Sequence, residues 1–85
     1  MKQLSYVLAK AAQRHARTVS GLVREIARFG SAVSVCCRET QTAVRKPRDI
    51  LDLGLRCGDE IRVTVEGRDE EAAVAAIQRF VIEQF

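Results

Sequence analysis

The sequence contains a single histidine, His15, which lies between two arginines directly before a segment with helical periodicity. A neutral imidazole is a competent nucleophile near pH 7. The first N–H groups of a helix have no intrahelical partners, and together with the helix dipole they favour anions such as phosphate. Arg17 can add a charge-assisted hydrogen bond to phosphate oxygens. His15, Arg17 and the N–H groups near Ala16 and Thr18 therefore have the chemistry needed to accept a phosphoryl group and pass it on.

The helix that positions these residues is predicted over 16–29. Its apolar residues recur at helical spacing, and Gly30 follows as a typical C-terminal stop. The predicted buried residues of this helix are Val19, Leu22, Val23, Ile26 and Phe29.

A helical wheel places Arg17, Gly21, Arg24 and Arg28 on one narrow stripe opposite these apolar residues. Such a stripe either docks an acidic partner or is a solvated face that adds only solubility. A glycine inside a helix costs roughly 0.5–1 kcal/mol relative to alanine. We expect Gly21 to allow close approach by the backbone of another molecule, with drift on an exposed surface as the alternative.

The remaining sequence predicts four strands and two further helices. Alternating apolar residues indicate strands over 3–8, 31–37, 40–45 and 60–67. A short helix runs from Pro47 to Gly54, and a C-terminal helix follows Asp69 with Ala73, Val74, Ile77, Phe80 and Val81 on one face. The turn at Arg38 and Glu39 lacks the glycine or asparagine that a two-residue hairpin loop prefers. The order β-α-β-β-α-β-α predicts an α+β domain over 1–85, with a four-stranded antiparallel sheet covered on one face by three helices.

Composition restricts the possible partners and location. The net charge is +3, with arginines spread through the first half and acidic residues grouped at 59–60 and 69–71. A basic first half suggests an acidic partner. There is no run of roughly 20 apolar residues and no secretory signal at the N-terminus, so we expect a cytoplasmic protein without membrane insertion.

The three cysteines carry no metal-ligand pattern. Cys36 and Cys37 are adjacent and would face opposite sides of a strand, so we expect one of them in the core, and Cys57 stands apart. No spacing of cysteine or histidine indicates a metal site, and no cofactor is expected.

The residues His15-Ala16-Arg17, opening an amphipathic helix, resemble the motif His-x-Arg-Pro of the phosphocarrier protein HPr family of the bacterial phosphotransferase system. Residues 51–77 are similar to the C-terminal half of that family: Leu-Gly ends the second helix, Gly-Asp-Glu leads into the last strand, and Glu-Gly precedes an acidic helix start. The order of elements is also that of the family's open-faced β-sandwich. The resemblance covers nearly the whole chain.

The resemblance implies a relay rather than an enzyme with its own small-molecule turnover. His15 would take a phosphoryl group from an enzyme I-type donor and give it to an enzyme IIA-type acceptor, with Arg17 stabilising the phosphate. We expect a monomer that docks acidic partners. The candidate docking residues are Gly21, Arg24, Arg28, Pro47, Arg48 and Leu51.

The sequence departs from the family pattern at several positions. Thr18 replaces the motif proline, and residues 13–14 are Gln-Arg rather than glycine and an apolar residue. Lys46 replaces a serine that is phosphorylated by a dedicated kinase in many members, so we expect that regulation to be absent. Pro47 and Arg48 replace apolar docking residues, while at least one of Ile50 and Leu51 is expected in the core.

Two other functions remain open from the sequence. A diverged regulatory paralogue could bind partners without phosphoryl transfer, which the departures favour. A small nucleic-acid binder would use the arginine stripe, but the chain has only four aromatic residues, two of them on core faces, so it lacks a stacking platform. We therefore expect no nucleic acid partner. The sequence does not distinguish the sugar-transport branch of the system from its nitrogen-linked branch.

Overall fold

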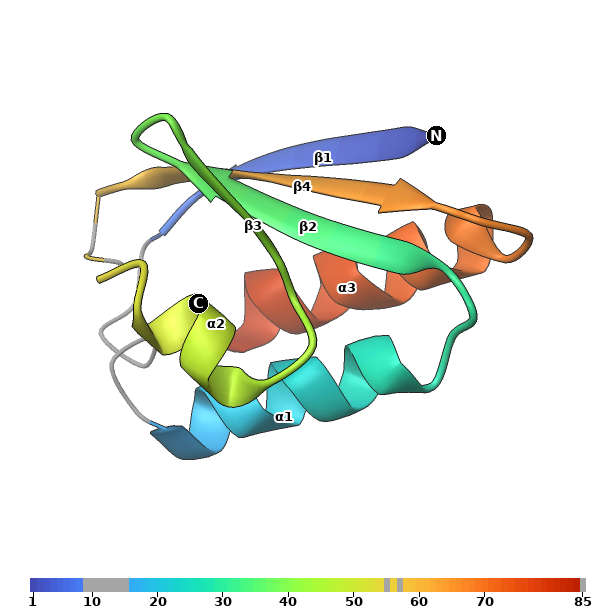
Figure 1. Ribbon diagram of the computed structural model, residues 1–85, viewed down its shortest axis with the longest axis horizontal. Coiled ribbons are helices and arrows are strands. Elements are labelled where there is room, and N and C mark those ends of the chain that lie inside the picture. The colour runs from blue at the N-terminus through green and yellow to red at the C-terminus, as the bar shows by residue number, and fades with distance from the viewer. Residues whose placement is uncertain (9–15, 55, 57, 85) are drawn as a thin grey trace.

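Four strands and three helices follow one another in the order that the sequence predicts (Figure 1). The computed structural model describes residues 1–8, 16–54, 56 and 58–84. The elements are β1 (Lys2–Val7), α1 (Ala16–Ala27), β2 (Ala32–Cys37), β3 (Thr40–Ala43), α2 (Pro47–Leu51), β4 (Glu60–Glu66) and α3 (Glu70–Gln84). Three elements end more than one residue earlier than predicted: the first helix ends at Ala27 instead of residue 29, the third strand at Ala43 instead of residue 45, and the second helix at Leu51 instead of reaching Gly54.

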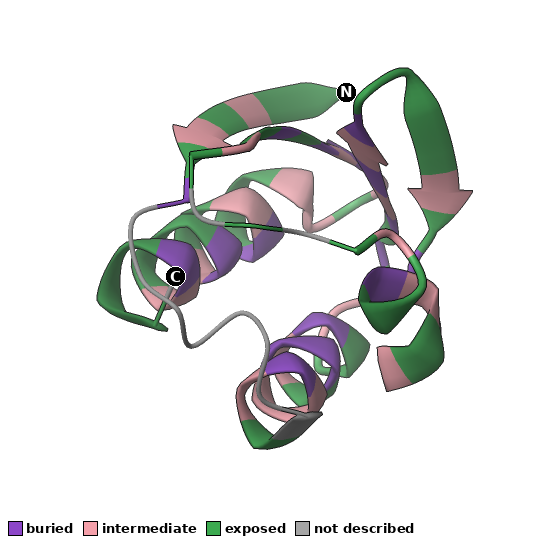
Figure 2. Ribbon diagram, turned by 90° about the vertical axis from the view of Figure 1, so that its left-hand side faces the viewer, coloured by how far each residue is buried: buried purple, intermediate pink, exposed green. Residues whose placement is uncertain are grey.

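The strands form one antiparallel sheet in the order β1-β4-β2-β3. The first strand pairs with the last one, from Lys2 opposite Val65 to Val7 opposite Glu60. All three helices lie on the same side of the sheet, and the other face is uncovered (Figures 1 and 2). The predicted open-faced α+β sandwich is thereby confirmed.

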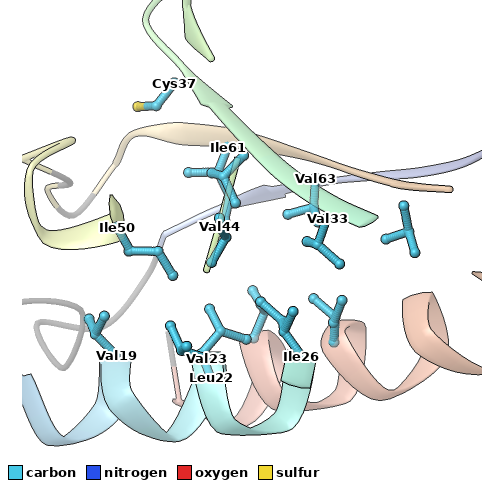
Figure 3. Packing of buried hydrophobic residues seen from close by; sticks show 14 of the residues in the cluster. Val19, Leu22, Val23, Ile26, Val33, Cys37, Val44, Ile50, Ile61 and Val63 are labelled. Carbon is cyan, nitrogen blue, oxygen red and sulfur yellow. The ribbon is translucent and has the colours of Figure 1, made fainter. Parts of the chain in front are cut away.

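The core lies between the sheet and the helices (Figure 3). β2 and β4 bury every second residue, as their alternating sequences predict. Val19, Leu22, Val23 and Ile26 of α1 are buried, and Figure 3 shows them directed toward the sheet. The buried strand residues are Val33, Val35, Cys37, Ile61, Val63 and Val65, and α3 adds Ala73, Ile77 and Val81. Phe29, Val74 and Phe80, also predicted on apolar faces, are partly buried against this core.

The adjacent cysteines face opposite sides of β2. Cys37 is buried in the core, and this burial raises the pKa of its thiol, whereas Cys36 is only partly buried. Both are free thiols. The prediction that one of the two packs as a small apolar residue is confirmed, and Cys57 lies outside the described residues.

The turn between β2 and β3 is built from residues that do not favour it. Arg38 and Glu39 both have positive φ, at 50° and 68°, as a tight hairpin turn requires. The Arg38 guanidinium offsets this strain by donating hydrogen bonds to Asp59 Oδ2 (2.6 Å), the Leu53 carbonyl (2.8 Å) and the Gly54 carbonyl (3.1 Å). The hairpin is thus held by contacts distant in sequence.

Asp69 connects the end of α1 with the start of α3. Its carboxylate accepts a hydrogen bond from the Ser31 hydroxyl and another from the Gly30 N–H (2.9 Å). These two hydrogen bonds lower the pKa of Asp69 below its ordinary value of 3.8, and the bond from Ser31 has the larger effect. The carboxylate therefore contributes stability only while it is ionised.

The lowered pKa of Asp69 predicts a stability difference that depends on pH. Because the folded-state pKa lies below the unfolded one, its stabilisation is complete above the ordinary pKa and is lost as the pH falls through the lowered value. In urea unfolding, the wild-type chain should be more stable than Asp69→Asn at pH 7, and the difference should shrink below about pH 4. A difference that stays constant down to pH 2 would contradict this assignment.

Gly67, directly after β4, has no room for a side chain. A Cβ atom there would lie 2.7 Å from the Ser31 Cα atom and 2.6 Å from its hydroxyl oxygen. Gly67→Ala should therefore reduce the free energy of unfolding by about 1–3 kcal/mol, since a backbone atom must move. Gly30→Ala is the matched control, because a Cβ atom there meets nothing closer than an Asp69 oxygen at 4.0 Å. Equal stability of the two variants in urea unfolding would refute the packing argument.

Candidate functional site

The segment that carries His15 lies in the chain between Leu8, just after β1, and the start of α1. Leu8, the residue after β1, is buried; its N–H donates to the Asp59 carbonyl (2.9 Å), and its carbonyl accepts from Gly58 (2.7 Å). The segment ends where α1 begins, at Ala16. His15 itself lies outside the described residues, as do residues 13–14, so its role stays a prediction. In the sequence, His15 directly precedes the first residue of α1.

The first turn of α1 is suited to an anion. It contains no acidic residue that would offset the positive end of the helix dipole. Arg17 is exposed and Thr18 is partly buried, while Val19 is fully buried and anchors the turn to the core. The backbone of Ala16 begins the helix. An exposed guanidinium beside the N–H groups of a first helical turn, which have no intrahelical partners, can bind the oxygens of a phosphoryl group.

The arginines of the predicted stripe are exposed, two of them on α1 and the third just after its end. Arg17, Arg24 and Arg28 are all exposed, in agreement with the helical wheel. Arg28 is already engaged within the chain: it forms an ion pair with Glu25 (2.7 Å) and lies over the Phe29 ring, 5.8 Å from its centroid. It also lies just beyond the end of α1, whereas Arg17 is the second residue of this helix, so about 15 Å of helix separates them. Arg28 is therefore too distant to bind the same phosphate, and its docking role stays a prediction.

Gly21 makes its close contact within the chain. A Cβ atom at this position would lie 3.1 Å from the ring of Phe80 on α3. The absence of a side chain lets the two helices approach, which explains the glycine without a second molecule. The expectation that Gly21 allows close approach by another molecule therefore loses its support. Its role in docking stays a prediction.

The second helix lies beside α1 and begins with a cationic segment. α2 packs against α1, and its residue Ile50 is buried. Figure 2 shows the two helices side by side below the sheet. Pro47 is the first residue of α2 and is partly buried, Arg48 is exposed, and Leu51 is 40% exposed. The prediction that at least one of Ile50 and Leu51 belongs to the core is confirmed.

Asp49 holds the start of α2 in place. Its carboxylate oxygen accepts hydrogen bonds from the N–H groups of Arg45 (2.9 Å) and Lys46 (3.0 Å). These two bonds lower the pKa of Asp49 below its ordinary value. Lys46 is the N-cap residue, and its side chain supplies no capping acceptor, because an ammonium group only donates. The position predicted to lack the regulatory serine is therefore the N-cap of α2.

The comparison with known families agrees with this arrangement. A sequence model described as "PTS HPr component phosphorylation site" matches residues 2–83. The chain belongs to the HPr family. Members of this family are phosphocarriers of the phosphotransferase system rather than enzymes with their own turnover.

Individual HPr relatives extend over nearly the full chain. The phosphocarrier protein HPr of Treponema pallidum is 30% identical over 71 residues, which are 84% of this chain and 81% of the relative. The HPr of Mycoplasma capricolum is 25% identical over 83 residues, covering 98% and 93%. The crystal structure of HPr-C-His from Thermoanaerobacter tengcongensis has a TM-score of 0.91 at 25% identity and covers 100% and 96% of the two chains.

Two residues at the start of α2 were not among the functional residues that the sequence predicts. Arg45 extends the cationic segment before α2, and Asp49 holds its backbone. An acidic residue three positions after the N-cap is the signal that could have identified Asp49.

Among the described residues there is no group of three or more side chains that could hold a metal ion, and no described helix is long and apolar enough to cross a membrane.

Proposed function

We propose that this HPr-family protein is a phosphoryl relay in which His15 accepts the phosphoryl group of an enzyme I-type donor and passes it to an enzyme IIA-type acceptor. The observation that carries the proposal is the exposed Arg17 on the first turn of α1, a turn without acidic residues that directly follows His15. Membership of the HPr family supports it.

The transfer uses one lone pair of the imidazole. A ring nitrogen of His15 attacks phosphorus, and the N–P bond forms while the bond between the donor and phosphorus breaks, its electron pair leaving with the donor. Arg17 and the N–H groups around Ala16 and Thr18 stabilise the negative charge on the phosphoryl oxygens. Transfer to the acceptor is the same displacement, with His15 as the leaving group.

Thr18 changes how this pocket is organised. A proline in the first helical turn has a fixed φ and no N–H. Threonine supplies an additional N–H for the phosphate but does not restrict the backbone in advance. We expect phosphate binding to be retained at a position where the family motif has proline.

The donor and the acceptor dock around this turn. Exposed cations of α1 and α2 favour acidic partner surfaces, and Leu51 adds an exposed apolar contact at the end of α2. The proposed docking residues are Gly21, Arg24, Arg28, Pro47, Arg48 and Leu51. We propose that the protein acts as a monomer, without a metal, a cofactor or a nucleic acid partner.

A complete relay tests the proposal. Phosphoenolpyruvate, the enzyme I of the source organism and its enzyme IIA are combined with and without this protein, and the phosphorylation of enzyme IIA is measured by intact mass. Enzyme IIA should gain a phosphoryl group only when the wild-type protein is present. With the His15→Ala variant in its place, enzyme IIA should gain none. Equal phosphorylation with the His15→Ala variant would refute the relay.

A second candidate function is regulatory binding without phosphoryl transfer. The observation that favours it is the exposed cationic start of α2, where Lys46 and Arg48 replace residues of the family pattern. Such a protein would bind its partner equally well as wild type and as His15→Ala, and neither form would gain a phosphoryl group. Calorimetry of both forms with the same enzyme I, together with their masses, distinguishes the two functions.

A further inference from the structure

The side chain of Arg38 joins the turn between β2 and β3 to the segment that leads into β4. Its guanidinium donates to the carbonyls of Leu53 (2.8 Å) and Gly54 (3.1 Å), just beyond the end of α2, and to Asp59 Oδ2 (2.6 Å), just before β4. A planar group with five donors is suited to several acceptors at fixed positions. We call Arg38 and these three acceptors the Arg38 clamp.

Asp59 is in turn bonded to the residue from which the histidine segment leaves. The Asp59 carbonyl accepts a hydrogen bond from the N–H of Leu8 (2.9 Å), and the carbonyl of Leu8 accepts one from the N–H of Gly58 (2.7 Å). The side chain of Leu8 is buried in the core. The clamp is therefore connected, through Asp59, to the residue that directly precedes the segment with His15.

The clamp lies at the end of the molecule where phosphoryl transfer is proposed. Figure 1 places the end of β1, the segment before β4, the end of α2 and the start of α1 at the same end of the long axis. Arg17 lies in the first turn of α1. A bond network at this end can position His15 relative to Arg17 without contacting the phosphoryl group.

The sequence keeps Arg38 at a position where another residue would suit the backbone better. Arg38 has a φ of 50° and Glu39 a φ of 68°. Glycine and asparagine adopt such values most readily, and tight hairpin turns prefer them. A residue in a strained conformation persists when other interactions hold it there, and such residues cluster at functional sites. The clamp supplies these interactions for Arg38, whereas Glu39 forms no ion pair within the described part of the chain.

We infer that Arg38 is a positioning residue of the relay, which acts through Asp59 to fix Leu8 and thereby the point from which the histidine segment starts. The inference rests on the proposed relay. Because a small misplacement of reacting groups slows a reaction strongly, loss of the clamp lowers the rate of transfer within the docked complex. Docking itself does not depend on Arg38, because its guanidinium is engaged within the chain.

The test removes the clamp and keeps the turn. Arg38→Gly removes the guanidinium at a position whose positive φ glycine accepts, so the hairpin should still form. Glu39→Gly is the matched control, because it makes the same kind of change at the next residue of the turn and leaves the clamp intact. Arg38→Lys keeps a positive charge beside Asp59 without the planar fork of donors, so it should restore the function only in part.

The kinetic measurement separates the rate of transfer from docking. Single-turnover kinetics with phosphoenolpyruvate and saturating enzyme I of the source organism give the rate, and calorimetry without phosphoenolpyruvate gives the affinity for the same enzyme I. Arg38→Gly should slow transfer about tenfold and change the affinity less than about threefold. Glu39→Gly should change neither, and the rate of Arg38→Lys should lie between those of Arg38→Gly and the wild type.

Amide hydrogen exchange measures the connection to Leu8 in the protein alone. The N–H of Leu8 bonds to the Asp59 carbonyl, and the N–H of Arg56 bonds to the carboxylate oxygen that Arg38 contacts. In Arg38→Gly both N–H groups should exchange about tenfold faster or more, because their acceptors are no longer held. The N–H groups that pair β2 with β4 should exchange as in the wild type, which shows that the fold is retained.

Three results would overturn the inference and keep the relay: equal transfer rates of Arg38→Gly and the wild type, equal slowing by Arg38→Gly and Glu39→Gly, or unchanged exchange at Leu8 in Arg38→Gly. A loss confined to affinity would also overturn it, because Arg38 would then act on docking. Wild-type protein that gains no phosphoryl group, with enzyme I active on a known HPr, would refute the relay and the positioning role with it.

Discussion

Replacing His15 with alanine is expected to abolish phosphorylation by phosphoenolpyruvate and enzyme I completely. His15 is the only histidine of the chain, so no second imidazole can take over. The thiol of Cys37 is buried and its pKa is raised, which disfavours the reactive thiolate. Intact mass at alkaline and acidic pH measures the effect: the wild type should gain one acid-labile phosphoryl group, and the variant should gain none.

The control for this variant is its folding. The core consists of residues from the strands and helices on either side of the histidine segment, so the thermal unfolding of His15→Ala should match that of the wild type. The enzyme I preparation must also phosphorylate a known HPr in the same experiment. An acid-labile phosphoryl group on folded His15→Ala would contradict the assignment of the acceptor.

Replacing Arg17 with alanine is expected to slow phosphoryl transfer about 100-fold, the usual cost of removing one well-placed donor to developing negative charge. Arg17 is exposed at the first turn of α1, whose N–H groups and dipole would still favour the phosphate in the variant but without the guanidinium charge. Arg17→Lys should recover part of the rate, because it keeps the charge and loses the bidentate geometry. Single-turnover kinetics at saturating enzyme I measure the chemical step.

Arg24→Ala is the matched control for Arg17→Ala. Arg24 lies on the same exposed stripe, seven residues or about 10 Å further along α1. Its loss should lower the affinity for enzyme I and leave the single-turnover rate at saturation unchanged. Equal single-turnover rates for Arg17→Ala and the wild type would show that the guanidinium does not contact the transferred group.

Local patterns in the sequence predict most of this fold. The alternation in 60–67 and the helical spacing of the apolar residues in 16–29 each identify a buried face, because one side of every such element must leave water. The hairpin turn shows where local patterns fail. Arg38 and Glu39 are poor turn residues, and the hydrogen bonds that hold Arg38 come from Asp59, Leu53 and Gly54, which no local pattern connects to it.

The proposed docking residues of α1 also show what the sequence can and cannot predict. The wheel of α1 correctly predicts that its arginines are exposed. Sequence alone cannot show that Gly21 faces Phe80, a residue 59 positions away that only the packing of α1 on α3 brings close. The carboxylate of Asp49, by contrast, stands three positions after the N-cap of α2, where a local pattern does predict its hydrogen bonds to backbone N–H groups.

The most direct test of the central claim observes the imidazole of His15 itself. Because the chain has one histidine, protein labelled with ¹⁵N in the histidine ring gives the signals of a single imidazole. After incubation with phosphoenolpyruvate and enzyme I at alkaline pH, the account predicts that one ring nitrogen shifts and couples to ³¹P, and that acidification reverses both changes. An unshifted ring, in a sample whose mass shows one added phosphoryl group, would place the phosphate elsewhere and contradict the account.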